Sequence, residues 1–210
     1  ESLDGPDRVV EFTAAYEQHL DHIAQYTKRI VLVTPVPFSN PLGLDIDIQK
    51  RNKSLAVYVA AIRKIGRERK LPVVNLAKAF GWGATPFAHS QNGMHLLPVG
   101  HWEAARIFAG QLGFADRVAS IKWAPQTDAA LEPLSAEKLR QAIGRKNDLW
   151  FRYWRPTNWA FLYGNRQQTP SSRDHENPGR RWFPEELQKV LPHLDEAEQR
   201  IHQAAKAASR

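Results

Sequence analysis

The stretch Arg29-Ile-Val-Leu-Val-Thr-Pro-Val-Pro37 decides the fold class that we expect for this chain. It is rich in β-branched residues, too short for a helix, and too continuously apolar for a half-exposed strand. We therefore expect a strand that is buried on both faces and ends at its prolines. A second run of the same kind follows at Leu71-Pro-Val-Val-Asn-Leu76.

Helical periodicity flanks both of these runs. Apolar residues recur every three or four positions from Asp7 to Lys28, before the first run, and again from Ile48 to Arg69, between the two runs. Another helix is expected to begin near Pro98, because proline is tolerated in the first turn of a helix. Alternating helices and strands build a parallel sheet with crossover helices. The sequence thus predicts an α/β domain over residues 1–113.

The alternation stops after Gly113, and we expect residues 114–210 to form a helical and irregular extension packed on the first domain. One helix is predicted from Ser135, a good N-cap residue, to about Lys146, and a final helix from Pro184 to about Ala207. The stretch between them is irregular and unusually rich in aromatic and arginine side chains. Its aromatic residues are Trp150, Phe151, Tyr153, Trp154, Trp159, Phe161, Tyr163, Trp182 and Phe183.

The aromatic stretch has three interpretations. Aromatic rings with arginines can stack on bases and neutralise phosphates, but no recognisable sheet or groove of a nucleic-acid-binding module accompanies them. Aromatic rings can also form platforms for sugars. The interpretation we favour is packing, because Trp and Tyr bury a large apolar body while their polar edge finds a partner.

The composition limits the class of protein. Apolar residues make up 42% of the 210 residues, enough for a globular core. We expect no transmembrane segment, because no run of about eighteen apolar residues occurs. The absence of cysteine excludes disulfides, thiolate metal ligands and a cysteine nucleophile. A net charge of +7 suits either an anionic partner or simply a solvated basic surface.

His95 is the candidate functional residue. In open parallel sheets, ligands bind beyond the carboxyl ends of the strands, so the loops after Thr34 and after Leu76 should share one functional edge. His95 follows Gly93 on the second of these loops, where it can exchange protons near neutral pH as a general base. The alternative is a loop histidine that simply satisfies a hydrogen bond.

The segment Asn92-Gly-Met-His-Leu96, followed by Pro98-Val-Gly-His-Trp102, resembles the last conserved block of the SGNH/GDSL hydrolases, Asp-Gly-x-His-Leu. The strand ending at Pro37 and the helix from Ile48 to Arg69 resemble that family's strand before the catalytic block and its long helix. The resemblance covers residues 1–113. It implies a flavodoxin-like three-layer α/β sandwich with a parallel sheet, only part of which this chain contains.

The resemblance also implies hydrolysis of acyl or acetyl esters of carbohydrates or lipids, without a cofactor or metal, by a protein that is exported or periplasmic. In this family a Ser attacks the ester carbonyl, and the residue at the place of His95 takes its proton. An Asp three residues earlier orients the imidazole. Here that position is Asn92, whose amide can hydrogen-bond the ring but cannot balance the imidazolium charge.

The family's Gly-Asp-Ser, Gly and Gly-x-Asn blocks do not occur in this chain. In one bacterial branch the third block ends in Asn and continues Glu-Ser-Phe-Ala-Gly. The first residues of this chain, Glu1-Ser-Leu-Asp-Gly-Pro6, resemble that continuation. Arg152-Tyr-Trp-Arg-Pro-Thr-Asn158 and Arg181-Trp-Phe-Pro-Glu-Glu186 also resemble the region that follows the domain in that branch. We therefore expect the chain to begin in mid-domain, with the nucleophile supplied by an N-terminal segment or a second chain.

Other candidate residues have weaker patterns. No serine stands in a Gly-x-Ser-x-Gly elbow or a Gly-Asp-Ser turn, and Ser39, just past the first strand, is the only one near the functional edge. His89, His95 and His101 are evenly spaced, but no metal signature uses a spacing of six. His19 and His22 are expected to be exposed helix residues. The alternative to an esterase is a non-catalytic module of the same fold that binds a carbohydrate or a partner protein.

Overall fold

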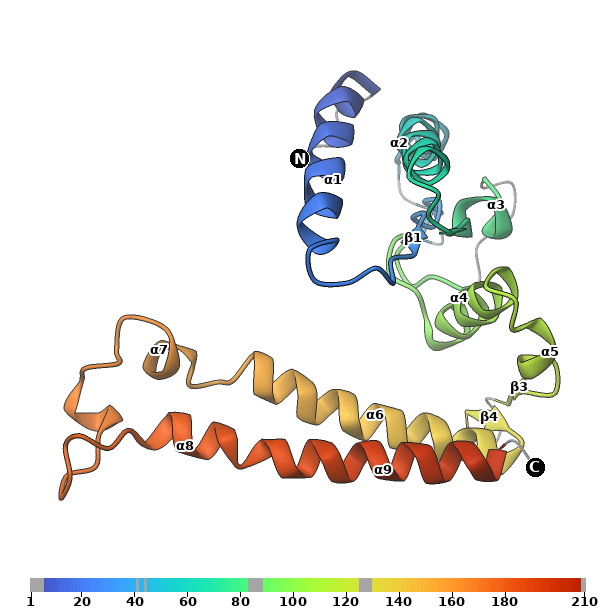
Figure 1. Cartoon of the computed structure of the whole chain (residues 1–210). Helices are drawn as coiled ribbons and strands as arrows, with labels where there is room; N and C mark the ends of the chain where they lie inside the picture. Colours follow the sequence, from blue (N-terminus) through green and yellow to red (C-terminus); the bar gives the residue numbers. More distant parts are fainter. Residues whose placement is uncertain (1–5, 41, 44, 83–88, 125–129, 209–210) are drawn as a thin grey trace. The chain divides into compact units, whose positions relative to one another are not determined.

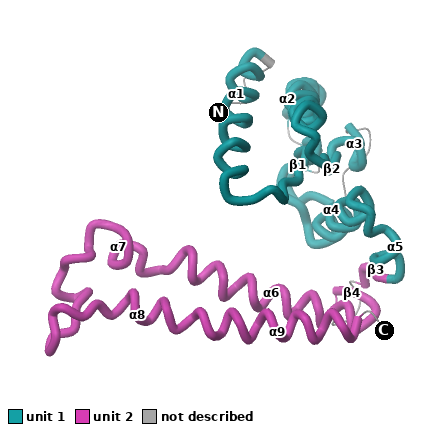
Figure 2. Tube along the Cα trace, in the orientation of Figure 1, with its two compact units in different colours: residues 1–120 teal, residues 121–210 magenta. Residues whose placement is uncertain are grey.

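The computed structural model describes residues 6–40, 42–43, 45–82, 89–124 and 130–208. The chain forms two compact units, residues 1–120 and 121–210 (Figure 1; Figure 2). The first unit continues past Gly113 because the short helix α5 (Ala115–Val118) contacts α4 (Pro98–Gln111). The segment from Glu1 to Gly5, on which part of the family resemblance depends, lies outside the described residues.

Two of the predicted helices form the body of the first unit. A 3₁₀ turn at Pro6–Arg8 leads into α1 (Val9–Ile23), and α2 spans Ile48–Glu68. The side chain of Asp47 caps α2 by accepting a 2.8 Å hydrogen bond from the backbone N–H of Lys50. Both helices pack together, as their apolar periodicity predicts.

The two apolar runs pair as parallel strands, as predicted. β1 (Leu32–Val33) lies beside β2 (Val73–Val74), with Leu32 opposite Val73. Apolar residues of α1, β1 and α2 meet in one buried cluster. Its members are Leu20, Leu32, Ile62 and Ile65, with Phe12, Tyr16, Ile30, Leu71 and Val73 packed against it.

The expectation that the first strand is buried on both faces is wrong. Val31 and Val33 are 37% and 36% exposed, whereas Leu32 is 2% exposed. The alternation arises because α1 and α2 both contribute to the cluster on the Leu32 face. In its described residues the first unit has one two-stranded sheet, so it has the helix and strand order of an α/β domain but not a flavodoxin-like sandwich.

The second run becomes helical sooner than expected. Asn75 ends β2 and caps the short helix α3 (Leu76–Phe80), with its side-chain oxygen 3.0 Å from the backbone nitrogen of Lys78. An Asn can satisfy a free N–H at a helix start, so the chain turns into a helix at Leu76. The helix expected near Pro98 begins there, as α4.

The second unit is a long helical hairpin (Figure 1). A small antiparallel pair, β3 (Lys122–Trp123) and β4 (Leu131–Glu132), precedes α6 (Leu134–Trp154). The short helices α7 (Trp159–Leu162) and η2 (Pro170–Ser172) follow. The return of the chain is α8 (Trp182–Gln188) and α9 (Val190–Ala208), and α9 packs antiparallel to α6.

Two predicted boundaries of α6 are wrong. Ser135 lies inside the helix, because Pro133 occupies the N-cap position without a side-chain capping bond. The helix also continues past Lys146 to Trp154, so the first part of the stretch expected to be irregular is helical. Trp150 stacks on Tyr153 and meets Trp154 edge to face, which lines the last turn of α6 with touching rings.

The predicted last helix is divided in two. α8 ends at Gln188 and α9 begins at Val190. Pro192 accounts for the division, because a proline ring clashes with the carbonyl four residues earlier, which here belongs to Gln188. Leu187 and Leu194 are buried, as the apolar periodicity predicts.

Candidate functional site

The loop that carries His95 is a small hydrogen-bonded structure. Its two ends approach at an antiparallel bridge between Ser90 and Leu96. The backbone nitrogen of Gln91 donates to the carbonyl of His95 at 3.0 Å. Gly93, at the tip, has a φ of +85°, a conformation that favours glycine. The glycine of the Gly-x-His pattern is therefore required by the turn itself.

Ser90 holds this turn from the inside. Its hydroxyl is buried, accepts from the backbone N–H of Gly93 at 2.8 Å and donates to the carbonyl of His95 at 3.0 Å. Ser90 is a contributor to the site that was not expected from the sequence. The signal that could have found it is a serine three residues before a turn glycine, since serine hydroxyls satisfy the backbone groups of turns.

Asn92 and His95 are in direct contact. The Asn92 amide nitrogen lies 2.9 Å from Nδ1 of His95, and its oxygen lies 3.2 Å from the same ring atom. Both side chains are exposed. The residue three positions before the histidine therefore fixes the ring through Nδ1, which leaves Nε2 as the nitrogen that a solute can reach.

The Asn92 amide has one favoured orientation. Its oxygen accepts from the backbone N–H groups of Met94 (3.1 Å) and His95 (2.9 Å), so its NH₂ group is the closer partner of Nδ1. An NH₂ group can only donate, so in this arrangement Nδ1 of His95 accepts and Nε2 carries the proton. A general base needs the opposite tautomer, with the proton on Nδ1 and Nε2 free to accept. The 3.2 Å contact between Nδ1 and the Asn92 oxygen would stabilise that tautomer.

The His95 loop is attached to the segment that follows β1. The backbone N–H of Ser39 donates to the carbonyl of Gly93 at 3.1 Å. Asn52 of α2, 5% exposed, clamps the preceding residue Phe38 by accepting from its N–H and donating to its carbonyl, each at 2.9 Å. This is how the chain brings the loop after the second strand next to the loop after the first.

Ser39 lies beside this loop but its hydroxyl is not accessible. The Oγ atom is buried and makes no hydrogen bond. A nucleophilic oxygen has to reach the substrate carbonyl and hand its proton to a base within hydrogen-bond distance. The structure therefore does not favour Ser39 as a nucleophile.

The polar residues at the strand ends are engaged in holding α3. The hydroxyl of Thr34 accepts from the backbone N–H of Ala77 at 3.0 Å and donates to the side-chain oxygen of Asn75 at 3.3 Å. The backbone N–H of Asn75 donates to the side chain of Gln111 on α4 at 2.7 Å. These groups anchor α3 and α4 to the sheet edge.

No carboxylate takes the place of the missing aspartate in the described part of the chain, where His95 forms no ion pair. Glu103, on the helix after the loop, is held by two hydrogen bonds from Arg106, at 3.1 and 2.7 Å. These bonds keep the pKa of Glu103 below its usual range. Glu103 is thus occupied by its own helix neighbour.

The other histidines do not assemble into a site. Among the described residues, no group of three or more His, Asp or Glu side chains is placed to hold a metal ion, so His89, His95 and His101 do not converge. His19 and His22 are exposed on α1, as predicted. None of the helices in the described ranges is long and apolar enough to cross a membrane.

Comparison with known proteins places the chain in no group: no protein-family model, no curated protein and no solved structure matches it.

Proposed function

We propose that this chain carries the histidine side of an SGNH-type ester hydrolase site, with His95 as general base and the nucleophilic serine contributed from outside these 210 residues. The substrates are acyl or acetyl esters of carbohydrates or lipids. The observation that carries the proposal is the contact between Asn92 and Nδ1 of His95, which orients an exposed imidazole from the position three residues before it.

Each loop residue has a role in this proposal. Gly93 and Ser90 shape the turn, Asn92 holds the ring, and Nε2 of His95 takes the proton of the serine as its oxygen attacks the ester carbonyl. The bond from Ser39 to Gly93 supports a position beside the segment after β1, the edge where open α/β sheets bind ligands.

Asn92 sets a limit on the rate in this mechanism. Its amide donates to Nδ1 at 2.9 Å and favours the tautomer that leaves Nε2 protonated. Loss of the carboxylate from a serine protease triad, which has the same tautomeric effect, lowers kcat about 10⁴-fold. We therefore expect Asn92→Asp to raise kcat by at least about tenfold, since a carboxylate accepts from Nδ1–H and balances the imidazolium.

The test is hydrolysis of p-nitrophenyl acetate by the protein expressed from the complete reading frame. We expect turnover that His95→Ala lowers by about tenfold to 10²-fold, because triad losses are not additive and Asn92 already replaces the carboxylate. His101→Ala is the matched control, because His101 is also an exposed histidine near the loop, and it should retain the rate. Equal turnover by His95→Ala and the unaltered protein refutes the proposal, and so does serine-dependent turnover by the 210 residues alone.

The Asn92 amide also favours a second function. In this alternative the chain is a non-catalytic module that binds a carbohydrate or a partner protein. With its oxygen taken by two backbone N–H groups, Asn92 is satisfied as a structural residue of the turn. This alternative predicts no turnover in the complete protein even with Asn92→Asp.

A further inference from the structure

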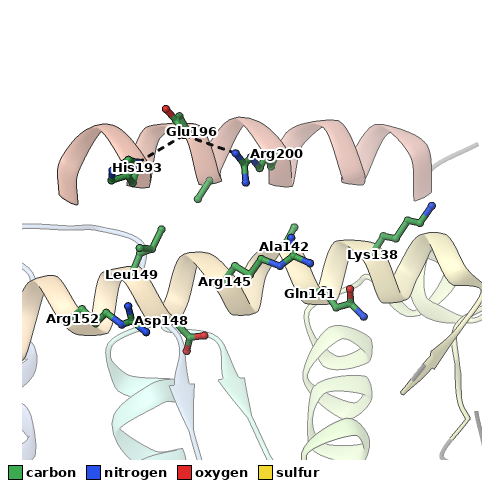
Figure 3. Close-up of a pocket in the computed structure, with 11 residues that line it drawn as sticks. Lys138, Gln141, Ala142, Arg145, Asp148, Leu149, Arg152, His193, Glu196 and Arg200 are labelled. Carbon is green, nitrogen blue, oxygen red and sulfur yellow. Dashed lines mark ion pairs between the residues drawn. The ribbon is translucent and has the colours of Figure 1, made fainter. Parts of the chain in front are cut away.

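A groove of about 560 Å³ runs along the hairpin of α6 and α9 within the second unit (Figure 3). Its lining comes from these two helices alone. In Figure 3 the side chains of Lys138 and Leu149 extend from α6 toward α9. The lining residues are Lys138, Gln141, Ala142, Arg145, Asp148, Leu149 and Arg152 of α6 and His193, Glu196, Ala197 and Arg200 of α9.

The lining of α6 repeats every seven residues. Lys138, Arg145 and Arg152 stand one heptad apart, so they form one stripe of cations with intervals of about 10.5 Å along the helix axis. Seven residues is also the spacing of His193 and Arg200 on α9. The groove therefore has a regular row of positive charge along one wall and further basic residues on the other.

Charge in the groove is unbalanced. Four lining residues are Lys or Arg, against the two carboxylates of Asp148 and Glu196. Glu196 lies 3.9 Å from both Arg200 and His193 of its own helix. Within the described residues Lys138, Arg145 and Arg152 form no ion pair, and all three are exposed. These cations are thus available to a partner.

The floor of the groove is apolar. Ala142 and Leu149 of α6 are partly buried, and Ala197 of α9 is 8% exposed. Small side chains between two helices allow a third helix to approach closely. A flexible polyanion would use the cations but has no need of this floor, whereas an amphipathic helix uses both.

We propose that this groove binds an acidic amphipathic helix of a partner protein. Carboxylates at heptad intervals on that helix would face Lys138, Arg145 and Arg152, and apolar residues between them would cover Ala142 and Leu149. A second copy of the groove does not fit, because the two cationic rows would face each other. The proposal concerns the second unit and does not depend on an esterase activity of the first.

The test uses the full chain and a synthetic helical peptide of three heptads, with Glu at one position of each heptad and Leu and Ala on the adjoining face. Binding is followed by fluorescence anisotropy of the labelled peptide at about 0.15 M ionic strength. We expect micromolar binding that Arg145→Glu with Arg152→Glu weakens at least about tenfold, since two attractive pairs become repulsive. Glutamate is a good helix former, so α6 should keep its helicity, which circular dichroism checks.

The matched control is Lys53→Glu with Arg67→Glu, two exposed cations of α2 in the first unit whose reversal changes the net charge equally. This control should bind the peptide within about twofold of the native chain. Equal weakening by both double variants means general charge attraction and overturns the proposal. It is also overturned if the native chain does not bind the peptide, or if unstructured poly-L-glutamate of the same length binds as tightly.

A second probe keeps the test informative if Arg145→Glu with Arg152→Glu loses helicity. Arg145→Gln with Arg152→Gln removes the same two charges with another good helix former. This variant should weaken binding of the peptide by about threefold or more. A peptide with Gln in place of Glu should bind the native chain as weakly as the Glu peptide binds this variant. Unchanged binding in either case contradicts a role for the cationic row.

Discussion

Glu137, in the first turn of α6, is expected to make the stability of the second unit sensitive to acid. It is 1% exposed, and its carboxylate accepts from Arg140 at 2.8 and 2.6 Å and from Gln141 at 2.8 Å. These bonds lower the pKa of Glu137 from 4.5 to about 2, and the bonds from Arg140 have the largest effect. Glu137 also lies at the positive end of the helix dipole.

The size of the effect follows from that pKa. A shift of one unit is worth about 1.4 kcal/mol, so the fall from 4.5 to about 2 corresponds to about 3 kcal/mol. The Arg140 side chain is 51% exposed, and screening by solvent reduces this to about 2 kcal/mol. Because the pKa is lower in the folded state, the stabilisation is complete above pH 4.5 and is lost as the pH falls toward 2.

The perturbation is Glu137→Gln, which keeps the volume and removes the charge. We expect it to lower the free energy of unfolding by about 2 kcal/mol at neutral pH and by less than about 0.5 kcal/mol near pH 2, where about half of the native carboxyl groups are protonated. The assay is urea denaturation of the full chain, followed by circular dichroism at both pH values. Glu186→Gln, at an exposed position of α8, is the control and should change little at either pH.

A loss for Glu137→Gln that is the same at neutral and low pH would refute the reasoning, because it would show that packing, not charge, is responsible. So would a loss below about 0.5 kcal/mol at neutral pH, which is the size of an ordinary surface substitution.

The remaining predictions concern the first unit. Asn52→Ala leaves the part-buried N–H and carbonyl of Phe38 without their side-chain partner and should cost about 1–3 kcal/mol in urea denaturation; an effect smaller than about 0.5 kcal/mol would contradict the clamp. Gly66→Ala places a Cβ 2.2 Å from Val73 Cγ2 and should destabilise the unit by about 1–3 kcal/mol in thermal unfolding. Gly110→Ala, with nothing within 4 Å of the new Cβ, should instead be neutral or stabilise by up to about 1 kcal/mol, and equal shifts for both glycines would disprove the steric argument.

Sequence periodicity predicted much of the first unit because its helices are amphipathic. The bounds expected for the helix from Ile48 and for the helix near Pro98 agree with α2 and α4, and the two apolar runs pair in parallel. The expectation that the Asn92 amide can hydrogen-bond the imidazole ring agrees with its contact to Nδ1 of His95. Both are local relations, set by residues within a few positions of each other, and local relations can be inferred from sequence.

Burial and the continuation of helices were less predictable. An apolar run such as the one containing Val31 and Val33 has the same composition whether one face or both faces are covered, and only the positions of α1 and α2 decide this. The aromatic residues from Trp150 to Trp154 have modest helix propensity, so the sequence suggested an irregular segment. In the structure α6 continues through this stretch, and the rings of Trp150, Tyr153 and Trp154 contact one another at its end.

By itself, the sequence determined the order of helices and strands in the first unit and the pairing of Asn92 with His95, because repeated apolar positions and a three-residue spacing act over short distances. The tertiary structure alone decided that the loop carrying His95 lies against the segment after β1, where the backbone N–H of Ser39 donates to the carbonyl of Gly93. It also decided that the cations of α6 meet Arg200 of α9 across one groove, since residues so far apart in sequence become neighbours only when the helices pack.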